Sequence, residues 1–262
     1  HFAIRRQRQM CIRDRLYKRG ISAFAEFTWG GLQRSKAEFK KVYRHRMFGA
    51  DFTSEEYAFI DGLDKPVALW TNLLVEEGTH RNALNQLKSP IEDYIIDLPE
   101  FNKKGAWTQK YSRRLDKIKV QSGALKETRK KIASLQNKNA SAKYNLEVYN
   151  EVINLVDYNF KLMKSLSLLD NSRSTEEETK LINGLQNLVY EFKEVRKQFE
   201  KVYSKSRILN KPNDYILDQD HHRHPANQSV NFDWQFTAEL MLINKIKNYL
   251  KIQNLENTSK AL

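Results

Sequence analysis

Apolar residues recur every three or four positions along most of the chain, which is the spacing of an amphipathic α-helix. Three long stretches keep this spacing, at about residues 107–135, 146–163 and 181–202. A narrow apolar stripe of this kind suits helices that lie nearly parallel, as in a bundle or an antiparallel coiled coil. The short connections at 137–140 and 170–174 predict antiparallel neighbours. The sequence therefore predicts an all-α fold, a bundle of long antiparallel helices.

Shorter helices are predicted before this bundle. Ser35 and Glu38 have the spacing of a capping box, in which a hydroxyl and a carboxylate bind the free amide groups at a helix start. Thr53 and Ser54, followed by Glu55 and Glu56, open a short second helix, and Asp64-Lys65-Pro66 opens a third. The stretch 89–105 contains two prolines and is predicted to be a connector.

Composition excludes several classes of protein. The mean hydropathy is -0.71. No apolar run approaches the roughly eighteen residues that a membrane span requires. One cysteine, Cys11, cannot form a disulfide framework. Nine glycines and five prolines in 262 residues are few for a turn-rich sandwich or barrel. We therefore expect a soluble helical protein with no membrane span and no cofactor.

The net charge of +13 is concentrated at the N-terminus. Residues 1–20 hold seven basic residues and one acidic residue, and so carry +6 of the total. The rest of the chain is only mildly basic. In the run from Lys126 to Lys131 no aromatic residue is interleaved that would stack on a base. We therefore predict no nucleic-acid partner.

The first twenty residues also differ from the rest in kind. The chain begins with His1 rather than Met, which indicates that upstream residues are missing. The segment 9–15, QMCIRDR, resembles the translated sequencing-adapter read-through found at the ends of metagenomic fragments. We expect residues 1–20 to be artefactual or disordered, in which case Cys11 has no chemical role. The alternatives are a basic nucleic-acid arm and a targeting presequence, since arginine-rich tracts serve both.

Two neighbouring segments carry a family resemblance. They are ISAFAEFTW at 21–29 and RSKAEF at 34–39. The pair resembles the end of the catalytic barrel in glycoside hydrolase family 20, the β-N-acetylhexosaminidases. There, an Ala-Glu-aromatic-x-Trp-like stretch on the last barrel helix precedes a polar segment with Arg, an acidic residue and Phe. Related barrels with helical C-terminal domains, such as the family 84 hexosaminidases, end similarly.

The resemblance implies substrate-assisted retaining hydrolysis of N-acetylglucosaminides or N-acetylgalactosaminides. In that family an Asp-Glu pair orients the substrate acetamido group and protonates the leaving oxygen, an exception to the scheme with two carboxylates. No Asp-Glu dipeptide occurs in this chain, and the family's motif would fall upstream of residue 20. The resemblance therefore implies a C-terminal fragment that has no catalytic residue and is inactive alone. A glycan substrate would bind through the missing catalytic domain, in the periplasm or outside the cell.

With this resemblance the chain divides into five predicted parts. They are an artefactual or disordered segment at 1–20, the end of a (β/α)8 barrel with short helices at 21–88, a connector at 89–105, a C-terminal helical bundle at 106–254 and a tail at 255–262. The bundle would buttress the barrel or shape the rim of its cleft. The sequence also leaves open a homodimer formed through the bundle.

The densest group of reactive polar side chains lies at 218–227, DQDHHRHPAN. His222 and His224 would converge on a metal ion if this segment were extended. No Cys and no paired His elsewhere completes a set of four ligands, so we predict no metal site. A substrate-contacting rim, a helix-docking role and a plain polar loop remain the alternatives. On the first of these, His222 and His224 are candidate substrate-binding residues.

Trp29 and Trp234 are the other candidate substrate-binding residues, because aromatic rings stack on sugar rings. Packing in the core is the alternative for each.

Four functions remain open from the sequence: the helical part of an exo-acting N-acetylhexosaminidase, the same role in another glycoside hydrolase, a helical scaffold or protein-interaction domain without catalytic activity, and binding to nucleic acid or a membrane surface. Upstream sequence separates the first two from the third, and salt-dependent retention on a polyanion separates the fourth.

Overall fold

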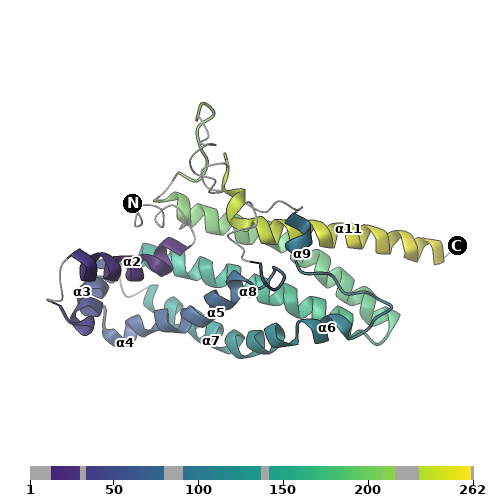
Figure 1. Cartoon of the computed structure of the whole chain (residues 1–262), viewed down its shortest axis with the longest axis horizontal. Helices are drawn as coiled ribbons and strands as arrows, with labels where there is room; N and C mark the ends of the chain where they lie inside the picture. The colour runs from purple at the N-terminus through teal and green to yellow at the C-terminus, as the bar shows by residue number, and fades with distance from the viewer. Residues whose placement is uncertain are drawn as a thin grey trace. The chain divides into compact units, whose positions relative to one another are not determined.

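The structure, a computed structural model, describes residues 13–29, 34–79, 91–136, 142–206, 208–215 and 230–260. These residues are mostly helical (Figure 1) and contain no strand, although Val75 and Ile95 form an isolated antiparallel bridge. The predicted all-α fold is therefore confirmed.

The longest helices among the described residues are α7 (Ser112–Gln136), α8 (Lys143–Asp170), α9 (Thr175–Ser204) and α11 (Thr237–Lys260). The first three match the three stretches of helical spacing in the sequence. Shorter helices are α2 (Arg13–Trp29), α3 (Lys36–Phe48), α4 (Ser54–Tyr57), α5 (Asp61–Thr71) and α6 (Ala106–Lys110), with single 3-10 turns η1 (Ala58–Ile60), η3 (Ile91–Tyr94) and η4 (Phe232–Phe236). None of the described helices is long and apolar enough to cross a membrane.

The predicted capping box at the start of α3 is present. At the start of α3, the Glu38 amide donates to Ser35 Oγ at 3.2 Å and the Ser35 amide donates to Glu38 Oε2 at 2.8 Å. Thr53 and Glu56 repeat this arrangement at the start of α4. Gly49 ends α3 with a φ of 99°, a conformation that favours glycine because it has no Cβ. These helix ends are thus set by local hydrogen bonds.

The described residues form two compact units, each built from three separate segments of the chain. The first unit consists of the described residues within His1–Asp64, Ala124–Ile153 and Phe199–Gln235. Its core is aromatic: the ring of Phe48 lies 4.9 Å from that of Phe52 and 6.4 Å from that of Tyr149. Lys205 near the end of α9 pairs with Glu147 near the start of α8 at 2.5 Å, so the two helices run antiparallel in this unit.

The second unit draws on Lys65–Gly123, Asn154–Gln198 and Phe236–Leu262. The ring of Phe192 on α9 lies 5.2 Å from Tyr158 on α8 and 5.9 Å from Phe236 before α11. Lys161 on α8 also pairs with Glu191 on α9 at 3.0 Å, so these two helices lie side by side in this unit.

A close approach of α5 and α7 in the first unit requires a glycine. A Cβ added at Gly62 would lie 2.7 Å from Thr128 Oγ1. The Thr128 side chain is buried, and its hydroxyl donates to the Ala124 carbonyl at 2.8 Å, so it has little freedom to move. Gly184 on α9, in contrast, has open space around it.

These two glycines give a matched pair of substitutions. Gly62→Ala should lower the free energy of unfolding by about 1–3 kcal/mol, because the added methyl group overpacks the contact. Gly184→Ala should raise it by about 0.5–1 kcal/mol, because alanine has the higher helix propensity. Urea denaturation measures both. The Gly62→Ala/Thr128→Ala double variant should recover part of the loss, and equal effects of the two single substitutions would contradict the close contact.

Candidate functional site

Three of the four candidate residues from the sequence lie outside what the structure describes in side-chain detail. Trp29 is the last residue of α2, and its side chain is not among those described. His222 and His224 fall in 216–229, outside the described residues. Their assignment to substrate binding stays a prediction.

Trp234 is the fourth candidate, and its surroundings are described. It lies in η4, is partly buried, and its ring meets that of Phe232 edge-on at 6.1 Å. Phe232 in turn stacks on Phe199 and lies beside Tyr203. Trp234 therefore borders an aromatic cluster of the first unit, with part of its surface accessible.

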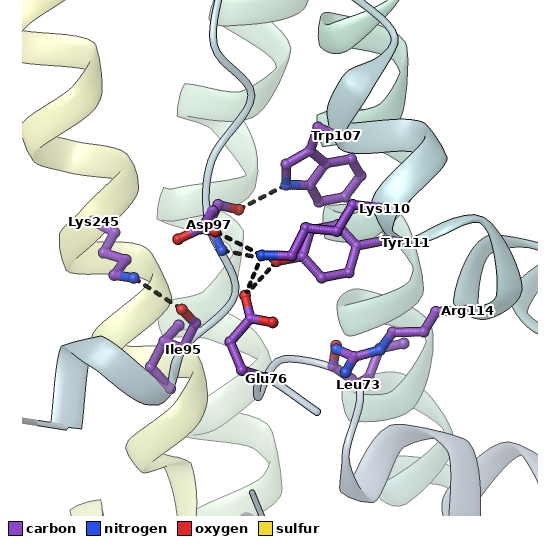
Figure 2. A network of polar contacts seen from close by, with 9 residues as sticks. All are labelled: Leu73, Glu76, Ile95, Asp97, Trp107, Lys110, Tyr111, Arg114 and Lys245. Carbon is purple, nitrogen blue, oxygen red and sulfur yellow. Dashed lines mark hydrogen bonds and ion pairs between the residues drawn. The ribbon is translucent and has the colours of Figure 1, made fainter. Parts of the chain in front are cut away.

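One connected polar site in the described part of the second unit was not found from the sequence. We call it the Tyr111 network, and it consists of Glu76, Asp97, Lys110 and Tyr111 (Figure 2). The Tyr111 hydroxyl donates to Glu76 Oε1 at 2.5 Å and accepts from the Asp97 amide at 3.1 Å. Lys110 Nζ donates to Asp97 Oδ2 at 2.7 Å and to Glu76 Oε1 at 3.1 Å. One hydroxyl and one ammonium group thus join two segments of the chain.

The backbone places the two carboxylates of this network side by side. The Glu76 amide donates to the Tyr94 carbonyl at 2.8 Å, and the Ile96 amide donates to the Leu74 carbonyl at 3.1 Å. These two bonds flank the bridge between Val75 and Ile95. Lys110 and Tyr111 come from the step between α6 and α7, which lies against this bridge (Figure 2).

Three long side chains around the network bind main-chain carbonyls. Trp107 Nε1 donates to the Asp97 carbonyl at 2.7 Å, and Arg114 Nη1 donates to the Leu73 carbonyl at 2.9 Å. Lys245 on α11 donates to the Ile95 carbonyl at 2.9 Å (Figure 2). The segments 73–76 and 95–97 are therefore held from α6, α7 and α11.

The surroundings of Tyr111 and Lys110 raise the pKa values of both side chains. Burial and the hydrogen bond to Glu76 raise the pKa of Tyr111 to about 12. Burial disfavours the charge on Lys110, but its hydrogen bonds, that to Asp97 foremost, outweigh burial and raise its pKa above the ordinary value. Near neutral pH, Tyr111 keeps its proton and Lys110 its charge, so neither suits the role of general base or nucleophile. The arrangement suits a structural clamp.

A second polar group is fully buried in the same unit. Glu239 on α11 has no exposed surface and accepts from Trp70 Nε1 at 3.1 Å and from Asn159 Nδ2 at 3.0 Å. Burial, followed by the charges of Glu239 and Glu191, raises the pKa of Tyr158 well above its ordinary value. Hydrogen-bonded carboxylates of this kind fix the register of neighbouring helices.

Within the described residues, no group of three or more His, Cys, Asp and Glu side chains is placed to hold a metal ion. Comparison of the chain with protein families, with curated proteins and with solved structures finds no match. The function is therefore argued from the residues themselves.

The i, i+4 spacing of Trp107 and Tyr111 was a visible signal in the sequence, and their rings do lie 4.7 Å apart. No local signal connects Glu76 with Asp97, because their proximity depends on a bridge between distant residues. Sequence reasoning therefore missed the carboxylates of the Tyr111 network.

Two tyrosine substitutions test the clamp. Tyr111→Phe should lower the free energy of unfolding by about 1–3 kcal/mol, because it removes the two hydrogen bonds of the Tyr111 hydroxyl, to Glu76 and from the Asp97 amide. Tyr158→Phe is the matched control, since the Tyr158 hydroxyl is buried and has no hydrogen-bond partner among the described residues. It should leave stability unchanged or raise it by up to about 1 kcal/mol. Urea denaturation measures both variants. A larger loss of free energy of unfolding for Tyr158→Phe than for Tyr111→Phe would contradict the role of Tyr111 as a clamp.

Stability should also fall at alkaline pH. Burial is the first cause of the raised pKa values of Tyr57, Tyr111 and Tyr158. An acid whose pKa is raised by folding stabilises the folded state below its unfolded pKa, here about 10, and this contribution is lost as the pH rises through the folded pKa. The free energy of unfolding should therefore decline from about pH 10 upward. Urea denaturation across this range should show a shallower decline for Tyr158→Phe, and an unchanged slope would contradict the prediction.

Proposed function

We propose that this chain is the C-terminal helical region of a glycoside hydrolase, an exo-β-N-acetylhexosaminidase that acts on N-acetylglucosaminides or N-acetylgalactosaminides of glycans. Its role is to support the catalytic barrel or the rim of the substrate cleft. The proposal starts from the resemblance of residues 21–29 and 34–39 to the end of that barrel.

One observation carries the proposal further: the two segments of the resemblance contact one another. Glu26 on α2 pairs with Arg34 Nη1 at 2.8 Å, just before α3 begins. The ring of Phe27 lies 5.6 Å from that of Phe39. Each contact joins one residue of the first segment to one residue of the second. The residues that resemble the family thus behave as one structural element.

The exposed surface of α2 also supports the proposal. Phe24 lies in the first segment of the resemblance and is 61% exposed. In the whole enzyme a preceding barrel would cover this ring and remove its apolar area from water. We therefore assign Phe24 to the contact with the barrel.

The chemistry would come from the upstream part of the enzyme. The Asp-Glu pair that polarises the substrate acetamido group would precede residue 20, and this chain contains no such dipeptide. The Tyr111 network fits a supporting role, because Tyr111 and Lys110 keep their protons near neutral pH and hold two segments of the chain together.

The upstream genomic DNA tests the proposal. A continuous open frame should encode strand–helix repeats with an Asp-Glu motif ahead of Ile21. The protein from that frame should release nitrophenol from an aryl N-acetyl-β-glucosaminide. Replacing the motif Asp by Asn should slow release by roughly 100-fold or more, because the acetamido group loses its orienting carboxylate. A start codon close to Ile21 with no barrel before it would refute the proposal.

In that whole protein, Phe24→Asp serves to test the assigned contact, with Val42→Asp on α3 as the control. Phe24→Asp should lower the free energy of unfolding by about 1–3 kcal/mol through the loss of apolar burial. Val42 is 45% exposed and lies outside the resemblance segments, so its substitution should have little effect. Equal effects of the two substitutions on the free energy of unfolding would show that Phe24 does not contact the barrel.

A helical protein-interaction domain without catalytic activity is the second candidate. Exposed apolar side chains on the long helices favour it: Tyr190 on α9 is 73% exposed, Val120 on α7 is 69% exposed and Leu168 on α8 is 57% exposed. A partner protein would cover such residues. The upstream open frame separates this candidate from the hydrolase.

A further inference from the structure

Helix α3 carries a concentration of positive charge. Its cationic residues are Lys36, Lys40, Lys41, Arg44 and Arg46, against one carboxylate, Glu38. Glu38 is already engaged, because it accepts the Ser35 amide in the capping box at 2.8 Å. Hydrogen bonding with the Ser35 side chain, and then with the Ser35 amide, lowers the pKa of Glu38, so the carboxylate stays charged and bound at the helix start.

The lysines of α3 are free to bind an anion. Lys36, Lys40 and Lys41 are exposed, and the described residues give none of them an ion pair. Arg44 is partly buried, and its guanidinium donates to the hydroxyl of Ser54 on α4, which holds it in place. An anion that approaches these lysines therefore breaks no ion pair with a described residue.

The cations form a row along one side of the helix. Lys36, Lys40 and Arg44 follow one another at intervals of four residues, which places them on the same side at steps of about 6 Å along the axis. Lys41 flanks this row. We call these four residues the α3 row. Its regular spacing suits a linear partner with repeated negative groups.

The other side of α3 excludes two kinds of partner. Phe39, Tyr43 and Phe48 are buried in the first unit, with at most 5% of their surface exposed. They are therefore unavailable to stack on unpaired bases or to enter a lipid bilayer. Val42 is exposed, but one aliphatic side chain is too little to anchor a helix in a membrane.

We propose that the α3 row binds an acidic polysaccharide through carboxylate or sulfate groups placed along the sugar chain. Lysine ammonium groups act as compact point charges and suit anions presented singly. Stacking on unpaired nucleic-acid bases needs accessible aromatic rings, and those of α3 are buried. Lysines also bind the phosphates of a duplex, and the experiment below includes a duplex for that reason. This surface belongs to α3 alone, so it does not depend on the proposed glycosidase activity.

Fluorescence anisotropy of a labelled heparin oligosaccharide, titrated with the full chain at low and at physiological salt, tests the proposal. The Lys36→Gln/Lys40→Gln/Lys41→Gln variant should bind about tenfold more weakly or worse, with a reduced dependence on salt, because three ion contacts are lost. The matched control is Lys180→Gln/Lys193→Gln/Lys197→Gln on α9, where all three lysines are exposed. This control removes the same charge and should change affinity by less than about twofold.

Circular dichroism checks that each variant keeps its helix content. If the triple variant unfolds, the three single α3 variants provide the test, and each should weaken binding. Equal losses in the α3 variant and the α9 control would overturn the proposal, since net charge alone would then explain binding. Absence of binding at low salt would overturn it as well. If the chain bound a DNA duplex of equal charge more tightly than the heparin oligosaccharide, the partner would be nucleic acid and the proposal would be overturned.

Discussion

Helix α8 has to be covered on nearly all sides, and the other described helices satisfy this requirement. From Leu146 to Leu169 its apolar residues, apart from Leu168, have at most 4% of their surface exposed. A helix that is apolar around most of its circumference is stable in water only inside a packed body. In the first unit it is met by Phe48 and Phe59, and in the second by Phe192. The bundle thus follows from the burial of one segment.

Polar residues on α8 decide how its neighbours are aligned. Apolar contacts tolerate sliding, whereas hydrogen bonds to buried groups have one good geometry. Asn145 donates to the Met47 carbonyl, and Asn159 donates to Glu239 at 3.0 Å. At the end of the helix, Asp170 accepts the Thr108 amide at 2.8 Å. The Asn145 bond lies within the first unit, and the bonds of Asn159 and Asp170 lie within the second.

The sequence allowed prediction of those features that arise from neighbouring residues. The three long helices follow from the apolar spacing, and the capping box of Ser35 and Glu38 follows from side chains three residues apart. The carboxylates of the Tyr111 network could not be predicted in this way, because Glu76 and Asp97 meet through the bridge of Val75 with Ile95. The close approach of Gly62 to Thr128 is likewise a tertiary contact. The substrate-binding roles of Trp29, His222, His224 and Trp234 stay predictions.

The three bonds from Trp107, Arg114 and Lys245 end on main-chain carbonyls, at Asp97, Leu73 and Ile95. A main-chain carbonyl is the same in every amino acid. Mutations at the receiving positions therefore leave these acceptors intact, whereas mutations at the three donors remove the bonds. Over evolutionary time the receiving segments are free to drift in sequence while the donors are constrained. In an alignment of true relatives, the helices would carry the recognisable signature of this clamp.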